Sequence, residues 1–265
     1  MSARPTERLP ITAIVASHNE ASLLPACLTG LSFCDELIVI DIDSTDDTAA
    51  VAKAHGARVV RHPWVPIAEQ ARGEVIAEAR NDWLLVRDPD EVIPPALAAE
   101  AVELFPRLDP DVAVVTAPIQ RYFGVRALKG GVWGGLKRDR LLVRRGSVEF
   151  QTGVNSKLVT KPGYRELVIP PRGDNVIAHY WVSGYRSFLE KHLRYLRLEG
   201  RDRADAGEIT GWRAVAATPW RSFRESFVRE RGYRDGLRGV ALGLLWSLYR
   251  TAAEVMLLRE LRRRG

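Results

Sequence analysis

Short, mostly apolar runs recur along the first half of the chain and limit the folds open to it. Four such runs lie at residues 11–16, 36–40, 57–60 and 83–87. Runs of this length and composition are typical of parallel strands buried on both faces. Segments with a helical spacing of apolar residues separate them, at residues 23–31, 48–55 and 68–80. The alternation predicts an α/β domain with a mostly parallel sheet and helices on both of its faces.

Polar clusters follow three of these runs directly, at residues 17–20, 41–47 and 88–91. We expect them at one edge of the sheet, beyond the carboxyl ends of the strands, where ligands bind in such folds. The last cluster, Asp-Pro-Asp-Glu, holds three carboxylates that repel one another unless a positive charge lies among them. Mg²⁺ or Mn²⁺ would supply that charge and keep positions for phosphate oxygens. The alternative is an acidic turn at the N-terminus of a helix that begins near Pro94.

The length and charge of the chain bound its organisation and its partners. A chain of 265 residues can hold one large α/β domain, or one domain with an appendage. We predict an α/β domain over residues 1–205 and a helical, aromatic-rich region over residues 206–265. The net charge of +6 favours anionic partners, and the chain is rich in arginine after residue 120.

Two cysteines and a polar N-terminus give expectations about the compartment. Cys27 and Cys34 match no metal or redox spacing, so we expect small buried side chains in a reducing environment. Residues 1–10 contain no apolar stretch of the kind that marks a secretory signal. The expected location is cytoplasmic.

Four segments, in this order and at these spacings, resemble the family-2 glycosyltransferases. They are VASHNE at 15–20, VIDIDSTDDT at 39–48, the helix with Gln70 and Arg72, and WLLVRDPDE at 83–91. Residues 177–200 and 219–239 further resemble the branch of lipopolysaccharide-core β-1,4-glucosyltransferases. The resemblance implies the GT-A fold with a C-terminal helical extension. It also implies an inverting hexosyltransferase that moves a sugar from a nucleotide-diphospho sugar, usually UDP-linked, to a cell-envelope glycan or lipid-linked acceptor.

The resemblance also implies roles for individual residues. The implied nucleotide-sugar-binding residues are Ala16, His18, Glu20, Asp41, Asp43, Arg72 and Asp88. Asp88 and Asp90 would hold Mg²⁺ or Mn²⁺, while His179 and Lys191 would lie on the acceptor or diphosphate side. For Arg72 and Lys191 a solvated helix surface is the alternative, and for His179 a packed structural role.

The general base of an inverting transfer is the point at which this sequence departs from its relatives. Related enzymes often carry Val-His-Glu after the arginine-rich β-region, whereas this chain has Asn155 and Ser156 in place of the last two residues. Because serine without a partner is a poor base, Glu149 and Asp139 are the candidates. The alternative is a nucleotide-sugar-binding homologue with lost or altered catalysis.

The C-terminal region suggests contact with a membrane. Residues 239–249 form an uncharged run of eleven residues, shorter than the roughly twenty that a membrane-spanning helix needs. We therefore expect an amphipathic helix in the plane of the membrane, with Trp246 and Tyr249 at headgroup depth. This predicts peripheral attachment at the inner face of the cell membrane, with a packed or dimer-interface helix as the alternative.

A nucleic-acid binder that uses the basic second half is the rival from another class of protein. It would need aromatic side chains interleaved with arginines. Tyr122, Phe123 and Trp133 form no recognised module of this kind. We therefore expect no nucleic-acid partner.

Overall fold

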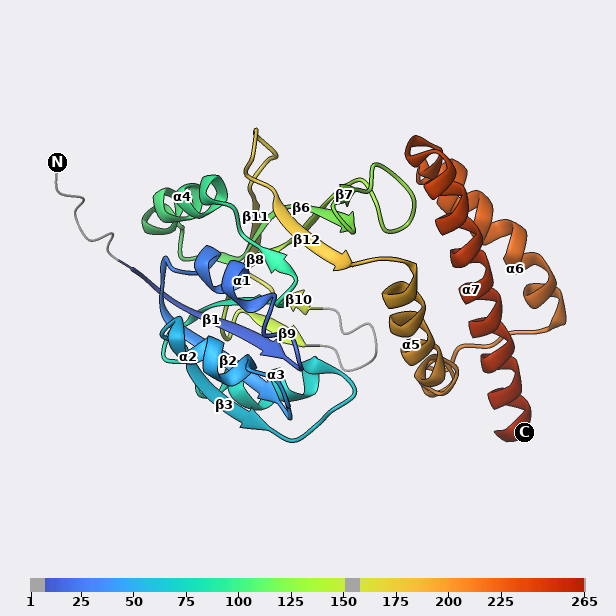
Figure 1. The fold of residues 1–265 in the computed structure, drawn as a ribbon, viewed down its shortest axis with the longest axis horizontal. Helices are drawn as coiled ribbons and strands as arrows, with labels where there is room; N and C mark the ends of the chain where they lie inside the picture. The colour runs from blue at the N-terminus through green and yellow to red at the C-terminus, as the bar shows by residue number, and fades with distance from the viewer. Residues whose placement is uncertain (1–7, 151–157, 265) are drawn as a thin grey trace. The chain divides into compact units, whose positions relative to one another are not determined.

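The computed structural model describes residues 8–150 and 158–264 and divides into two compact units (Figure 1). The first unit comprises Met1–Ile119, Arg138–Glu149 and Leu158–His179. The second comprises Gln120–Lys137, Phe150–Lys157 and Tyr180–Gly265. The domain boundary predicted after residue 205 stays a prediction, and the second unit includes the helix that precedes it.

Parallel strands form one half of the main sheet. They are β1 (Leu9–Ser17), β2 (Cys34–Ile42), β3 (Arg58–His62) and β4 (Trp83–Arg87). The connecting helices are α1 (Leu24–Gly30), α2 (Thr48–Ala54) and α3 (Ala68–Ile76). All four predicted strands are therefore present. Helix α3 ends four residues before the predicted end at residue 80.

Strand β1 is buried on both faces, as its continuous apolar run predicts. Ile11, Ala13 and Val15 point into one core cluster, which also contains buried residues of α1, α2 and α4 (Pro95–Leu104). Ile14 and Ala16 alternate with them and pack in a second cluster with Ala71 and Val75 of α3. Helices therefore cover both faces of the sheet, because successive side chains of a strand point to opposite faces.

The remaining strands make the sheet mixed. They are β5 (Glu91–Val92), β6 (Val112–Phe123), β7 (Arg126–Ala127), β8 (Leu136–Arg144), β11 (Arg165–Val168) and β12 (Ile177–Val182). The strand order is β3-β2-β1-β4-β8-β6-β12-β5, with β7 and β11 paired to β6. Strand β8 runs antiparallel to β4, and β12 antiparallel to β5. Strands β9 (Val148–Phe150) and β10 (Leu158–Thr160) form a separate two-stranded sheet.

The second unit is mainly helical. Its helices are α5 (Tyr185–Asp205), α6 (Trp212–Arg224) and α7 (Leu237–Arg264). A π-helical turn at Glu225–Arg229 and a 3₁₀ turn at Gly232–Asp235 lie between α6 and α7. Another 3₁₀ turn, at Phe105–Arg107, belongs to the first unit. Helix α7 packs against both α5 and α6. The core of this unit is aromatic, with Trp133, Trp181, Phe188 and His192 in mutual ring contact.

Two side chains that were expected at membrane depth are instead used inside the helical unit. The Trp246 indole packs edge-on against Trp133 and donates a hydrogen bond to Glu225 over 3.2 Å. The Tyr249 hydroxyl donates to Glu199, and burial raises its pKa above the usual range. Both rings are half-buried and have partners within the unit, so the headgroup position expected for Trp246 and Tyr249 stays a prediction.

Helix α7 is also longer than the uncharged run from which it was predicted. It is 28 residues long, and its 18-residue apolar window has a mean hydropathy of 1.3. It therefore passes the length and composition test for a membrane-spanning helix, a test that core helices of soluble proteins also pass. Only 28% of that window is buried within the protein.

Both cysteines lie in the core of the first unit, as expected. Cys27 and Cys34 are free thiols, each no more than 1% exposed. Burial raises the pKa of the Cys27 thiol to about 12 and that of Cys34 still further. Both side chains are therefore neutral and behave as small apolar residues.

Candidate active site

The carboxyl ends of β1, β2 and β4 meet at one edge of the first unit. Ser17 of β1 pairs in register with Asp41 of β2, and Val15 pairs with Arg87 of β4. The three polar clusters of the sequence lie at the carboxyl ends of these strands. The topology therefore brings together clusters that begin as many as 71 positions apart in the sequence.

Asn19 fastens the loop after β1 to the loop after β2. Its side-chain oxygen accepts hydrogen bonds from the backbone N–H groups of Thr45 at 2.7 Å and Asp46 at 3.3 Å. Its own N–H donates to the Ser44 hydroxyl over 3.0 Å. Asn19 has a φ of 56°, a left-handed conformation that asparagine tolerates better than most residues. One amide side chain thus fixes the relative position of the two loops.

The residues expected around the base and ribose lie along this pair of loops. The His18 ring lies 2.5 Å from the carbonyl oxygen of Ile42, measured from Nδ1. Ala16 is buried at the end of β1, and the Glu20 N–H donates to the Thr48 hydroxyl over 3.3 Å. A cavity of about 290 Å³ opens beside them, lined by Asp41, Asp43, Ser44, Arg61, His62 and Pro63. Most of the lining residues are polar or charged, and they include both of the expected aspartates.

The acidic turn after β4 is neutralised in part by two arginines. Arg72 of α3 forms an ion pair with Asp88 and also donates to the carbonyl oxygen of Arg87 over 3.3 Å. Its side chain is only 12% exposed, and the nearby carboxylates hold its pKa above the usual value although burial alone would lower it. Arg72 is therefore a fixed cation at the edge of the turn and not a solvated helix residue.

Arg87 is the second cation, and it lies at the centre of a buried network. Its guanidinium is 2.9 Å from a Glu91 oxygen and 2.7 Å from an Asp139 oxygen, and it also donates to the carbonyl oxygen of Arg140. The residue is 2% exposed. Burial lowers the pKa of Arg87, but the two carboxylates more than offset that effect. Arg87 thus joins the acidic turn to strand β8.

The two carboxylates of this network respond differently to their surroundings. Burial raises the pKa of Glu91, and Arg87 only partly offsets this. Burial would also raise the pKa of Asp139, but the charge of Arg87 and its hydrogen bond hold that pKa below the usual value. Asp139 is therefore ionised at neutral pH.

Asp90 and His179 form the remaining part of the turn. The His179 ring nitrogens lie 3.4 Å from Asp90 Oδ2 and 3.3 Å from Glu91 Oε1. Neither nitrogen makes a well-aligned hydrogen bond among the described residues, and Asp90 Oδ1 is likewise buried without one. The His179 side chain is 10% exposed. The ring therefore separates two carboxylates at the base of the turn.

These residues fit a hard divalent cation that a ligand helps to hold. Asp90 offers a carboxylate oxygen with no hydrogen-bond donor among the described residues, and Asp88 lies two positions away. The described parts of the chain contain no group of three or more His, Cys, Asp or Glu residues arranged as a complete metal site. Mg²⁺ is commonly held by one or two carboxylates together with phosphate oxygens, so a diphosphate would complete the ligand set.

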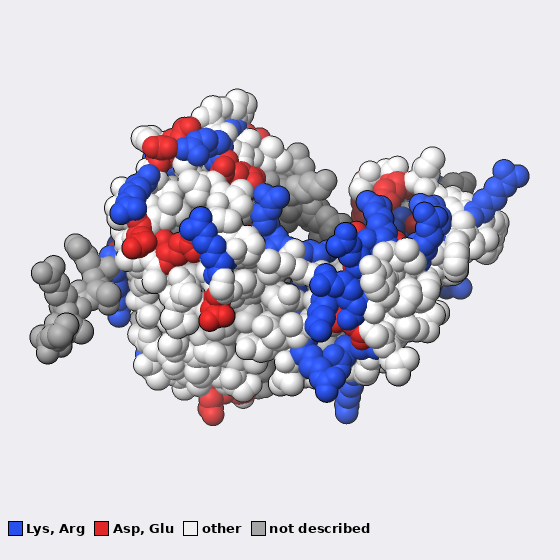
Figure 2. All heavy atoms as spheres, turned by 90° about the horizontal axis from the view of Figure 1, so that it is seen from above, with Lys and Arg blue, Asp and Glu red and all other residues white. Residues whose placement is uncertain are grey.

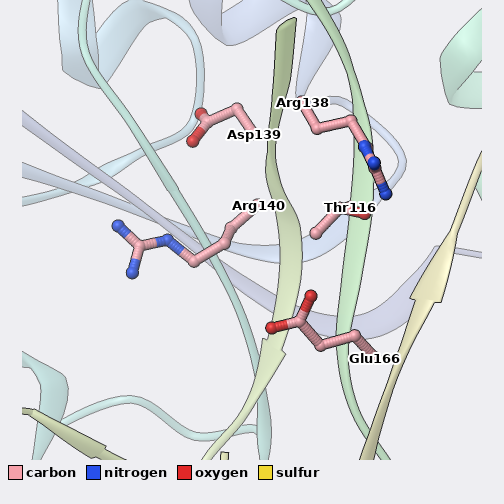
Figure 3. Close-up of a pocket in the computed structure, with 5 residues that line it drawn as sticks. All are labelled: Thr116, Arg138, Asp139, Arg140 and Glu166. Carbon is pink, nitrogen blue, oxygen red and sulfur yellow. The ribbon is translucent and has the colours of Figure 1, made fainter. Parts of the chain in front are cut away.

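Asp139 also lines the second cavity, of about 320 Å³, shown in Figure 3. Its lining residues come from three strands and are Thr116, Arg138, Asp139, Arg140 and Glu166. Glu149, the other candidate base, is exposed on β9, which belongs to the separate two-stranded sheet. Asn155 and Ser156 lie outside the described residues. Of the two candidate carboxylates, Asp139 is the one joined to the acidic turn, through Arg87.

Lys191 belongs to the second unit and is described there alone. Its ammonium group lies 5.9 Å from the centroid of the Trp181 ring, which is within the range of a cation–π contact. The expected position of Lys191 on the acceptor or diphosphate side stays a prediction.

Sequence reasoning missed three residues that organise the site, namely Asn19, Arg87 and Glu91. A cation at the end of an apolar strand, followed by three carboxylates, was an available signal for Arg87. The left-handed backbone at Asn19 and its hydrogen bonds across 26 and 27 positions left no signal in the local pattern.

Several curated proteins match part of this chain. A TPR repeat-containing protein of Synechococcus elongatus is 45% identical over 75 residues, or 28% of this chain and 19% of that protein. A glycosyltransferase of Rickettsia felis is 34% identical over 97 residues, or 36% of this chain and 34% of that protein. This chain thus spans about a fifth to a third of the length of these relatives.

Two other comparisons extend over nearly the whole chain. The lipopolysaccharide core biosynthesis glycosyltransferase LpsC of Rhizobium meliloti is 24% identical over 255 residues, covering 94% of this chain and 92% of LpsC. The structure of a mannosyltransferase from Pyrobaculum calidifontis, in complex with GDP-Man and Mn²⁺, superposes with a TM-score of 0.54 at 18% identity. The superposition covers 97% of this chain and 89% of that chain, and it supports the GT-A fold.

The model of the family described as Glycosyl transferase family 2 matches residues 12–156. This match covers more than half of the chain and contains the loops after β1 and β2, Arg72, and the acidic turn. The chain therefore belongs to glycosyl transferase family 2, and it has the GT-A fold.

Proposed function

We propose that the protein transfers a hexose from a UDP-sugar to a cell-envelope glycan or glycolipid, with inversion at the anomeric carbon. The observation that carries this proposal is the acidic turn, where Asp88 and Asp90 follow β4 beside the loops of β1 and β2. Two of its carboxylates have arginine partners, while Asp90 keeps one buried oxygen without a hydrogen bond among the described residues. That combination suits a diphosphate held through a divalent ion.

In this proposal the loops of β1 and β2 bind the nucleoside. Asp41 and Asp43 line the neighbouring cavity and would accept hydrogen bonds from the base or ribose. His18, Glu20 and the backbone near Ala16 would close the other side. Asn19 would act indirectly, by keeping the two loops in register.

The negative charge of the diphosphate would be balanced by Arg72 and by a metal ion held by Asp88 and Asp90. Arg72 would stabilise the negative charge that develops on the departing nucleotide, a form of electrostatic stabilisation that acts strongly in a partly buried site. Asp90 and Asp88 would hold Mg²⁺ or Mn²⁺, which supplies Lewis-acid stabilisation of the leaving group when bound. His179 would hold the Asp90 carboxylate in place.

An inverting transfer requires a base that takes the proton of the acceptor hydroxyl as its oxygen attacks the anomeric carbon. Asp139 is ionised and lines a cavity of suitable size, which supports it as a candidate. Its pairing with Arg87 weakens it as a base, and Glu149 is the other candidate. A protein that binds the donor without transfer is the competing proposal, because Ser156 replaces the glutamate found in relatives.

The similarity to LpsC, whose name assigns it to lipopolysaccharide core biosynthesis, supports this acceptor and suggests a location. A lipid-borne core glycan would be presented at the cytoplasmic face of the inner membrane. We propose that the protein works there while attached peripherally.

A panel of nucleotide sugars tests the donor and the metal together. Thermal unfolding is measured with UDP-, GDP- and ADP-linked sugars, each with and without Mn²⁺, since a ligand that binds the native state raises its apparent stability. We expect the largest rise for a UDP-sugar with Mn²⁺. Stabilisation that is equal with and without Mn²⁺ would contradict metal assistance, and no stabilisation by any UDP-sugar would contradict the donor class.

Transfer assays with variants then address the base. Asp139→Asn and Glu149→Gln are compared, each with donor binding measured separately by thermal shift. Loss of transfer with retained donor binding in one variant would identify the base. Wild-type protein that binds the donor but transfers to no envelope acceptor, with neither variant changing its behaviour, would favour the binding homologue.

A further inference from the structure

The net positive charge of the chain is carried by its last helices. Residues 206–265 contain twelve arginines against six aspartates and glutamates, a difference equal to the net charge of +6 of the whole chain. Figure 2 shows basic side chains gathered over the helical unit, which also contains the arginines and the lysine of α5. An anionic partner would therefore be drawn to this unit more than to the α/β unit.

Helix α6 presents an aromatic stripe to solvent. Trp212, Ala216 and Trp220 are four positions apart and therefore share one face of the helix. Trp212 is 61% exposed and Trp220 is 69% exposed, although indole side chains are usually well buried. Val215, Thr218 and Ser222 form the opposite, buried face. Most of the surface of each indole therefore faces solvent and is not used for the packing of α6 within its own unit.

Arginines flank this stripe. Arg213, Arg221 and Arg224 of α6 are all exposed. The guanidinium of Arg262, near the end of α7, lies 5.2 Å from the centroid of the Trp212 ring. Helix α7 adds a second exposed apolar row, in which Leu244 and Leu248 are 52% and 67% exposed. Indole rings surrounded by arginines are the composition of helices that lie in the headgroup region of anionic membranes.

We infer that α6 is the membrane-binding element of this protein, with Trp212 and Trp220 inserted among the headgroups of an anionic bilayer. Arg213, Arg221 and Arg224 contact the lipid phosphates beside them. This inference deepens the proposed function and rests on it in one respect. An enzyme whose acceptor is lipid-borne must work at the membrane surface, so attachment would bring it to its substrate. It places the attachment on α6, whereas the sequence pattern pointed to Trp246 and Tyr249 of α7.

The contacts of α7 argue against a membrane-spanning position for that helix. Glu254 is 8% exposed and pairs with Arg203 of α5 over 2.9 Å. Ser247 donates to the carbonyl oxygen of Pro219 in α6 over 2.8 Å. Insertion of α7 across a bilayer would break these contacts and leave a carboxylate in the hydrocarbon layer, which is costly.

A second copy of the chain is a poorer occupant of the same surface. Two copies docked through α6 would bring their arginine clusters together, and like charges facing each other across an interface oppose binding. A bilayer that contains phosphatidylglycerol supplies the complementary negative charge. An anionic lipid surface is therefore the partner of α6 that suits both its exposed tryptophans and its arginines.

Co-sedimentation with vesicles tests the inference. The full chain is incubated with phosphatidylcholine vesicles, and with vesicles of about one part phosphatidylglycerol to two parts phosphatidylcholine. We expect binding to the anionic vesicles and little binding to the neutral ones. The double variant Trp212→Ala/Trp220→Ala should bind more than about tenfold more weakly. The triple variant Arg213→Gln/Arg221→Gln/Arg224→Gln should lose roughly two orders of magnitude, because each arginine near an anionic surface contributes about fivefold.

Matched controls come from the first unit. Trp64 is 55% exposed, so Trp64→Ala removes an exposed indole elsewhere. Arg80, Arg107 and Arg172 are exposed, and their joint replacement by glutamine changes the net charge by the same amount. Vesicle binding that falls equally in the controls, or that survives both α6 variants, would overturn the inference. A change in oligomeric state in the α6 variants without a change in vesicle binding would assign the surface to a second copy instead.

Donor binding is measured on the same variants by thermal shift with nucleotide sugars. This readout does not involve lipid, so it separates the two proposals. Retained donor binding with lost vesicle binding supports the α6 surface. Absence of donor binding in the wild-type protein would count against the proposed function and leave the vesicle result to be judged alone.

Discussion

At the scale of single residues, the geometry of the site depends on the buried guanidinium of Arg87, which pairs with two carboxylates at once. Arg87 contacts Glu91 and Asp139 from a position that is almost fully buried. Removal of one partner from such a network is costly, because a charge is left behind without compensation. The network therefore links the stability of the first unit to the geometry of the acidic turn.

Replacement of Arg87 by methionine should lower the free energy of unfolding by about 3–5 kcal/mol, because Glu91 and Asp139 would lose their buried partner. Urea denaturation followed by circular dichroism measures this change. Arg80→Met, at an exposed position, is the control and should change the free energy by less than about 1 kcal/mol. If Arg87→Met were no more destabilising than the control, the buried network would contribute little to stability.

Asp139 gives a prediction about pH. Its pKa in the folded protein is below the ordinary value of 3.8. Its ionised form therefore contributes stability above pH 3.8, and that contribution is lost as the pH falls through the lower, folded value. Asp139→Asn should be less stable than the wild type at pH 7, and the difference should shrink at pH values below about 4. A difference that stays constant down to acid unfolding would contradict the assigned direction.

The sequence predicted the residues of the acidic turn better than it predicted their partners. Asp88 and Asp90 were expected from a short motif at the end of a strand. The ion pair between Arg72 and Asp88 joins positions 16 apart, and Arg87 reaches Asp139 across 52 positions. Such pairings depend on which strands become neighbours, and β8 returns to β4 only in the folded sheet.

At the scale of elements, loops carry the site and tight turns hold the helical unit together. The loops after β1 and β2 have little regular structure, yet Asn19 joins them by side-chain hydrogen bonds. Four parallel strands could be predicted because each is a continuous apolar run. The short antiparallel strands β5 and β7 have two residues each and left no periodic signal.

Asn19→Ala should weaken donor binding by about tenfold, because the hydrogen bonds to Thr45 and Asp46 are lost and alanine tolerates the left-handed backbone poorly. Asn19→Asp is the matched variant, since it keeps an acceptor oxygen. Calorimetric titration with a nucleotide sugar measures both. Equal affinities for Asn19→Ala and the wild type would show that the two loops do not need this link.

Gly130 lies in a turn that packs closely on the 3₁₀ turn at Gly232–Asp235 of the second unit. The backbone N–H of Gly130 donates to Asp235 over 2.8 Å, and a Cβ atom at Gly130 would lie 2.0 Å from the carbonyl oxygen of Arg231. Gly130→Ala should therefore lower the melting temperature markedly. Gly73→Ala is the control, because nothing lies within 4 Å of a Cβ there, and within helix α3 it should stabilise by about 1 kcal/mol. Similar melting temperatures for the two variants would contradict the close packing at Gly130.

At the scale of the whole molecule, the proposed donor site and the proposed membrane-binding helix belong to different units. Apart from Lys191, the proposed site residues lie in the first unit, while α6 lies in the second. The apolar run of α7 was visible in the sequence. The contacts of Trp246 and Tyr249 were not, because their partners Trp133, Glu225 and Glu199 come from other segments.

This division predicts that variants in the two units act independently. Asp90→Asn should keep the vesicle binding of the wild type, and Trp212→Ala/Trp220→Ala should keep its affinity for nucleotide sugars. Both properties are measured on each variant, by co-sedimentation and by thermal shift. A variant of either unit that lost both properties while remaining folded would indicate that the two functions share residues.

The most direct test of the account is the binding of Mn²⁺ in the presence of UDP, measured by electron paramagnetic resonance on wild-type protein, Asp90→Asn and Asp174→Asn. Asp174 is an exposed carboxylate in the same unit and serves as the control. We predict that Asp90→Asn weakens Mn²⁺ binding by about tenfold or more, while Asp174→Asn leaves it unchanged. Equal Mn²⁺ affinity in all three proteins would contradict the claim that the acidic turn holds a diphosphate through a divalent ion.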